Sequence, residues 1–136
     1  MSSYLTFYLV PKAEDSKPLD LISYSRNTHI YQYFDETLNV AYIGMGNETQ
    51  YTELNTQKVD EVLEAMKEGI SKYQRQISEY EKHAAGNTDI IEYILELKEE
   101  LDILEWSLHK VEFIRDIVIE ATHSYCDYNK VLCNVD

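Results

Sequence analysis

The chain is poor in the residues that cross-link or interrupt a fold: it has two cysteines, two prolines and four glycines among 136 residues. Cys126 and Cys133 lie close together near the end, so they cannot staple the fold, and we expect reduced thiols in a cytoplasmic protein. The glycines form no phosphate-binding loop, dinucleotide fingerprint or nucleophile elbow. We therefore expect neither enzymatic activity nor a cofactor.

Long apolar runs and positive charge are also scarce. No apolar run reaches the roughly 18 residues of a membrane-spanning helix, and the start lacks the basic flank of a secretory signal. Twelve lysines and arginines oppose 25 aspartates and glutamates, which gives a net charge of −13. Residues 89–120 hold ten of the acids and three of the bases. Because such a surface repels phosphate polymers and anionic lipids, we expect no direct binding to nucleic acid or membranes.

What the chain does have is two apolar stripes at heptad spacing in its second half. Their members recur at steps of three and four residues, which places each set on one face of a helix. The stripes are Val59, Val62, Leu63, Met66, Ile70, Tyr73, Ile77, Tyr80 and Ile90, Ile94, Leu97, Leu101, Leu104, Leu108, Val111, Val118, the second being interrupted by Arg115. The short break at 84–87 predicts that helices at about 57–83 and 89–120 form an antiparallel hairpin.

The first half is rich in aromatic and β-branched residues arranged in short runs. These runs predict a helix of about two turns at 29–34 and strands at 3–10, 19–24, 39–43 and 51–54. Gly44 to Asn47 is expected to turn the chain between the last two strands.

We therefore predict a single α+β domain over residues 1–136. A small N-terminal antiparallel sheet of three to four strands with one short helix (1–55) packs on a long C-terminal antiparallel helical hairpin (56–123). Residues 124–136 are expected to form a C-terminal tail.

The second long helix is apolar on more than one side. Outside its seam it has Ile91, Ile103, Trp106, Phe113, Ile114 and Ile117. A helix that is apolar on two sides must contact two neighbours. One is its hairpin partner, and we expect the other to be the N-terminal sheet or a second copy of the protein.

Two groups of residues have the chemistry of metal ligands. One face of the second helix has four carboxylates and an imidazole: Asp102, Glu105, His109, Glu112 and Asp116. The first helix offers no Glu-x-x-His partner, so a solvated, ion-paired face is the simpler interpretation. His123, Cys126 and Cys133 lack the spacing of a zinc finger or ribbon. We expect no metal at either place.

The segment before the short helix is the best candidate for a small-ligand site. Amides at a helix N-terminus attract anions, and Arg26 and His29 add positive charge in an acidic protein. The candidate ligand-binding residues are Ser25, Arg26, Asn27, His29 and Tyr31. An ordinary capping segment with a surface arginine is the plainer alternative.

Twelve tyrosines are the other unusual feature. Tyrosine joins an apolar ring to a polar hydroxyl, which suits contact surfaces as well as half-buried sheets. Together with the acidic helix, they favour a non-enzymatic protein–protein interaction module that binds a partner with a basic surface, or forms a homodimer. The candidate partner-binding residues are Tyr24, Tyr33, Tyr42, Glu92, Glu96, Glu99 and Glu100.

Two alternatives stay open. Carboxylates along a stiff helix can imitate nucleic-acid phosphates and inhibit a host nuclease or defence system, a mode that suits a phage or mobile-element protein. The other alternative is a domain that binds an anionic, nucleotide-like small molecule at the Arg26/His29 segment.

Overall fold

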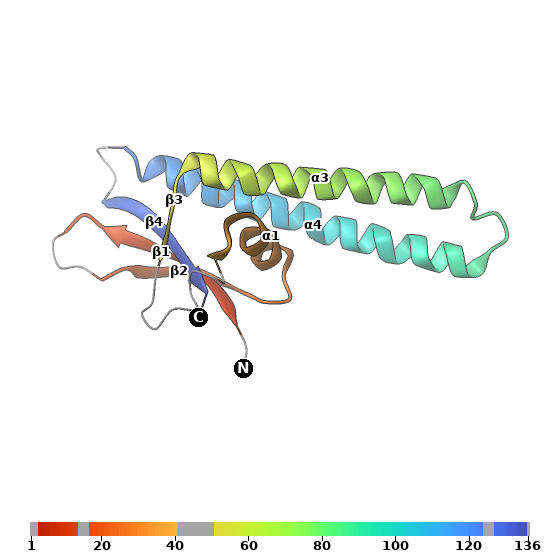
Figure 1. The fold of residues 1–136 in the computed structure, drawn as a ribbon, viewed down its shortest axis with the longest axis horizontal. Helices are drawn as coiled ribbons and strands as arrows, with labels where there is room; N and C mark the ends of the chain where they lie inside the picture. Colours follow the sequence, from red (N-terminus) through yellow and green to blue (C-terminus); the bar gives the residue numbers. More distant parts are fainter. Residues whose placement is uncertain (1–2, 14–16, 41–50, 124–126, 136) are drawn as a thin grey trace.

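The computed structural model describes residues 3–13, 17–40, 51–123 and 127–135. Its elements follow the order β1 (Tyr4–Pro11), β2 (Leu19–Ser25), α1 (His29–Leu38), β3 (Thr52–Leu54), α3 (Thr56–Glu81), α4 (Thr88–Glu120) and β4 (Tyr128–Val135). The predicted α+β architecture is confirmed: an antiparallel sheet packs against the helices, and the hairpin of α3 and α4 extends well beyond the sheet (Figure 1). No helix in the described ranges is long and apolar enough to cross a membrane.

The four-stranded sheet has the order β2-β1-β4-β3, so the C-terminal strand lies in its interior. The expectation of a tail at 124–136 was therefore wrong for Tyr128–Val135. In β4, Val131 and Cys133 alternate toward the core, where they pair with Leu9 and Phe7 of β1. Leu132 and Asn134, which point to the opposite face, are buried as well, so the middle of β4 is covered on both faces. The sheet thus joins the two ends of the described chain.

The predicted strand at 39–43 does not begin where expected. Asn39 instead ends α1 in the left-handed conformation, with φ of 55°, and its N–H bonds to the carbonyl of Asp35. Asparagine tolerates this conformation better than most residues, which explains why the helix stops here. Val40 is buried in the core, while residues 41–43 and the expected turn at 44–47 lie outside the described residues.

The helical hairpin follows the predicted seam. Both helices begin at an asparagine whose side chain accepts a backbone N–H, from Lys58 to Asn55 at 2.8 Å and from Ile90 to Asn87 at 3.2 Å. These N-caps satisfy amide groups that have no partner within the helix. Most of the seam residues are buried, while Tyr80 near the tip is exposed. The buried members are Val59, Val62, Leu63, Met66 and Ile77 of α3, and Ile94, Leu97, Leu104, Val111 and Val118 of α4.

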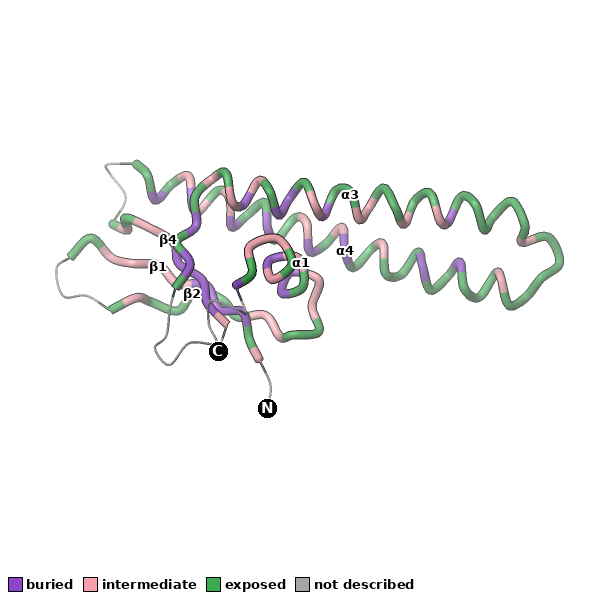
Figure 2. The backbone as a smooth tube through the Cα atoms, viewed as in Figure 1, coloured by how far each residue is buried: buried purple, intermediate pink, exposed green. Residues whose placement is uncertain are grey.

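Helix α1 fills the space between the sheet and the hairpin. Its Ile30, Tyr31 and Phe34 are buried, and the ring of Phe34 meets that of Phe7 edge-on, with centroids 5.1 Å apart. In Figure 2 the buried residues concentrate where α1, the sheet and the half of the hairpin beside the sheet meet. The far half of the hairpin has only a small separate cluster of Ile77, Ile94 and Leu97.

The second apolar side of α4 contacts the rest of the protein only in part. Ile114 is buried in the core and Ile117 packs against it, as expected for residues facing the sheet. Trp106 and Phe113, in contrast, have 68% and 64% of their surface exposed. The rest of the described chain therefore covers the two largest off-seam residues only slightly.

Candidate protein-interaction groove

A groove of about 420 Å³ runs between strand β2 and helix α4. We call it the β2–α4 groove; its apolar lining consists of Leu21 and Ile22 from β2 and of Trp106, Phe113, Ile114 and Ile117 from α4. Its volume falls in the range of binding pockets, about 300–1,000 Å³. Trp106 and Phe113 are seven residues apart, two helical turns, so both stand on the same side of α4.

A β-bulge explains how two consecutive residues of β2 line one groove. Phe7 of β1 pairs with Ile22, but the next residue, Tyr8, pairs with Asp20, so Leu21 has no partner on β1. Neighbouring residues of a regular strand point to opposite faces, and an extra residue breaks that alternation. The bulge therefore lets both Leu21 and Ile22 contribute apolar surface on the side of α4.

Carboxylates stand beside the two exposed rings. Asp102 lies one helical turn before Trp106 and Asp116 about one turn after Phe113, and both acids are exposed. The basic side chains at the groove already have partners. Lys110 Nζ lies 5.9 Å from the ring centroid of Tyr24, and His109 Nδ1 lies 3.1 Å from Oε1 of Glu112. Burial raises the pKa of Tyr24, so this residue offers a neutral ring to the lysine.

A second pocket of about 460 Å³ continues from the groove toward the start of α1. Asn27, in the turn after β2, and His29, at the start of α1, line one side. Glu100, Ser107 and Lys110 line it from α4. His29 Nε2 lies 3.2 Å from Oε2 of Glu100, which ties the start of α1 to α4. The pocket thus combines hydrogen-bonding groups and a cation with the aromatic wall that it shares with the groove.

The structure separates the predicted ligand-binding residues. Asn27 and His29 line the second pocket, while the side chain of Arg26 is exposed and does not line it. The carbonyl of Ser25 accepts the backbone N–H of Thr28 at 3.0 Å, and Thr28 is the N-cap of α1. Tyr31 is buried in the core. The segment therefore serves as a helix cap, and part of it also faces a pocket.

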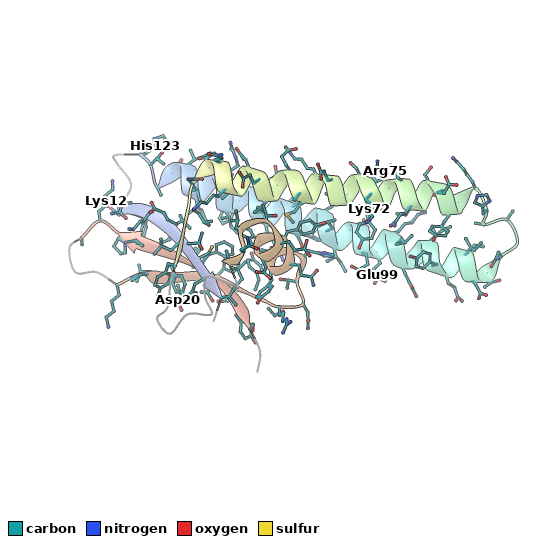
Figure 3. The ribbon with its side chains drawn as sticks, viewed as in Figure 1. Lys12, Asp20, Lys72, Arg75, Glu99 and His123 are labelled. Atoms are coloured by element: carbon teal, nitrogen blue, oxygen red, sulfur yellow. The ribbon has the colours of Figure 1, made fainter. Side chains whose placement is uncertain are left out.

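The predicted partner-binding residues are spread over three places. Tyr24 lines the β2–α4 groove, and Tyr33 packs between α1 and the hairpin, where burial, and then electrostatic interaction with Tyr73 and Glu36, raise its pKa. Glu92, Glu96, Glu99 and Glu100 are all exposed on α4, and Glu99 is labelled on the extended part of the hairpin in Figure 3. Tyr42 lies outside the described residues.

Neither group with metal-ligand chemistry forms a metal site in the part of the chain that the structure describes. No three histidine, cysteine, aspartate or glutamate side chains of these residues converge there. Cys133 lies fully buried in the sheet, and burial raises the pKa of its thiol to about 12. Cys126 lies outside the described residues. The carboxylate face of α4 is solvated, with His109 paired to Glu112.

Sequence reasoning marked Trp106 and Phe113 only as off-seam apolar residues and did not place them in a site. Their signal was present in the seven-residue spacing, but the groove also needs β2, whose distance from α4 no local pattern gives. No family model, characterised protein or solved structure matches the chain, so its functional assignment rests on the groove itself.

Proposed function

We propose that this chain is a non-enzymatic protein-interaction module that binds a partner with a basic surface through the β2–α4 groove. The exposure of Trp106 and Phe113, 68% and 64%, beside an apolar groove is the observation that supports this most. Soluble proteins seldom leave large aromatic side chains exposed next to other apolar surface unless a partner covers them. Tryptophan is also among the residues that contribute most to binding energy at protein interfaces.

The charges around the groove indicate the kind of partner. Asp102, Glu112 and Asp116 are exposed beside the two rings, and His109 is paired with one of them. In a chain of net charge −13, this excess of carboxylates attracts lysine and arginine and repels another acidic surface. The same repulsion acts between two copies of the chain that meet through this face, which makes a homodimer there less favourable than a basic partner.

A pair of variants on the same helix tests the proposal. Trp106→Ala combined with Phe113→Ala removes the exposed rings, and Ile91→Ala combined with Leu95→Ala removes two apolar side chains, 46% and 60% exposed, farther along α4. Each protein is used to capture partners from a lysate of the source organism at low and high salt. We expect wild type and the Ile91/Leu95 variant to retain the same partner and the Trp106/Phe113 variant to lose it. Added salt should weaken the binding of this partner to the wild type.

All four side chains are exposed, so thermal melting should shift little in either double variant. Equal retention of partners by both variants contradicts the proposal, as does failure of the wild type to retain any protein. A captured nuclease that duplex DNA releases would assign the same surface to nucleic-acid mimicry.

The pocket beside His29 supports a second candidate, binding of an anionic, nucleotide-like small molecule. Its volume of about 460 Å³ and the aromatic wall of Tyr24 and Trp106 favour such a ligand. The lining includes the cation of Lys110 and also the carboxylate of Glu100, which is paired with His29. Titration calorimetry with a nucleoside monophosphate tests it. We expect heat of binding that Lys110→Gln removes and that Lys72→Gln, on the distant hairpin, leaves unchanged. No heat with the wild type rejects this candidate.

A further inference from the structure

Among the described strands, β2 is an edge of the sheet, because in the order β2-β1-β4-β3 only β1 lies beside it. The N–H of Arg26 donates to the carbonyl of Ser3 at 3.1 Å, which continues the β1–β2 ladder by one residue. Backbone groups of an antiparallel strand alternate between its two sides. The N–H groups of Ser23 and Ser25 therefore point away from β1.

Ser23 is the residue best placed to bond with an added strand. The outward carbonyl of Ser25 already accepts the N–H and the hydroxyl of Thr28, at 3.0 and 2.8 Å. At Ser23 both the N–H and the carbonyl point outward, and no described segment pairs with this side of the strand. Its side chain stays within the sheet, where Oγ lies 2.9 Å from Oγ1 of Thr6.

The edge of β2 has little that would prevent pairing. Natural edge strands are commonly protected by several charges, by proline within the strand or by a cover. In β2 the only charged residue is Asp20, and two of its apolar side chains, Leu19 and Ile22, are exposed at 49% and 42%. The β2–α4 groove lies beside this edge, with Trp106 and Phe113 on its far wall.

We propose that an extended segment of a basic partner protein adds to the sheet as a new strand beside β2, centred on Ser23. Its alternate apolar side chains enter the β2–α4 groove between Ile22 and Phe113, and its lysines or arginines meet Asp102 and Asp116. This inference rests on the proposed function and specifies the form of the partner. Main-chain hydrogen bonds and side-chain pockets are the two components of recognition by strand addition.

Charge argues against a second copy of the chain as the occupant. Two copies paired through β2 would bring their acidic α4 helices toward each other, including the exposed Asp102, Glu112 and Asp116 of each. Of the described basic groups near this edge, Lys110 already lies over Tyr24 and His109 beside Glu112, while Arg26 is exposed just past the end of β2. A basic partner avoids this repulsion.

The experiment selects binders for the whole protein from two phage-displayed libraries, one of linear random peptides and one of helix-constrained peptides. We expect enrichment of linear peptides with alternating apolar and basic residues. In the complex with the best peptide, amide hydrogen exchange measured by NMR should slow at Ser23 and Ser25. Enrichment of helical or acidic peptides, no enrichment, or unchanged exchange at Ser23 overturns the inference.

A matched pair of variants separates backbone pairing from side-chain effects. Ser23→Pro removes the outward N–H, and proline is tolerated on edge strands where that group faces solvent. Ser23→Ala keeps the N–H and removes the hydroxyl that contacts Thr6. We expect the proline variant to bind the peptide about tenfold more weakly or worse than the alanine variant.

If the proline variant does not fold, the hydrogen exchange of Ser23 in the wild type alone tests whether the peptide adds as a strand beside β2. A peptide that requires Trp106 and Phe113 but leaves Ser23 exchange unchanged overturns strand addition and leaves the proposed function standing. A peptide that binds without Trp106 and Phe113 contradicts both.

Discussion

The hydroxyl of Tyr33 on α1 occupies the space above Gly69 in the middle of α3. A methyl group at position 69 would overlap this hydroxyl and would lie 3.1 Å from Cζ of the same ring. It would also lie 3.3 Å from a methyl carbon of Leu104 on α4. The glycine thus allows both α1 and α4 to pack closely against α3, which explains a residue that otherwise weakens a helix.

Gly69→Ala should therefore destabilise the protein, against the usual trend for helices. In an open helical position this change stabilises by about 0.5–1 kcal/mol, whereas overpacking a core costs about 1–3 kcal/mol. We expect the free energy of unfolding, measured in urea, to fall. Adding Tyr33→Phe, which removes the overlapping hydroxyl, should recover part of the loss. A Gly69→Ala protein as stable as wild type contradicts the close packing.

The environment of Tyr33 also predicts weaker folding at alkaline pH. Its pKa is raised above 10.0 by burial and then by the charges of Tyr73 and Glu36, so the folded state favours the protonated phenol. The contribution of Tyr33 to the free energy of unfolding is complete below pH 10.0, its pKa in the unfolded state. This contribution is lost as the pH rises through the pKa of the folded state. Urea unfolding from about pH 8 to about pH 11 should show a steeper loss for wild type than for Tyr33→Phe.

Tyr80→Phe, at an exposed position on the hairpin, is the matched control and should follow the wild type. Parallel curves for wild type and Tyr33→Phe would mean that the half-buried hydroxyl of Tyr33 does not contribute to the alkaline loss.

The hairpin could be predicted because its determinants are local. Steps of three and four residues define the seam wherever the helix lies, and Asn55 and Asn87 cap the helices that follow them directly. Strand β4 could not be predicted in this way. Its partner β1 lies at the other end of the chain, and the apolar run Val131–Cys133 is too short to identify a strand by itself.

The candidate site was predictable only in part, for a similar reason. The spacing of Trp106 and Phe113 showed a second apolar side of α4 and suggested contact with the sheet. The rotation of α4 that places Ile114 in the core leaves Phe113, the preceding residue, facing out beyond β2. That rotation depends on the packing of α1 and the whole sheet, which no single segment encodes.

Cys133 should behave as an inert thiol in the folded protein. Burial raises its pKa from 9.0 to about 12, with Lys58 opposing the shift, so the reactive thiolate is about a thousandfold rarer at neutral pH. In a Cys126→Ser variant, where Cys133 is the only thiol, a disulfide reagent should react slowly with native protein and promptly in urea. Prompt reaction with the native protein would show that Cys133 is accessible.

Arg115, which interrupts the apolar seam of α4, should couple energetically to Asp60 of α3. Its Nε lies 2.6 Å from Oδ1 of Asp60, and the hydrogen bond followed by the charge of this carboxylate raises the pKa of the guanidinium. A double-mutant cycle with Asp60→Asn and Arg115→Gln measures the coupling in urea unfolding. Both side chains remain partly exposed, so we expect a favourable but modest coupling that decreases as salt is added.

A cycle with Glu64 and Lys67, exposed neighbours on α3 whose charged atoms are 3.7 Å apart, should give a smaller value. Equal coupling in the two cycles would show that the contact between the helices adds nothing beyond an ordinary surface ion pair.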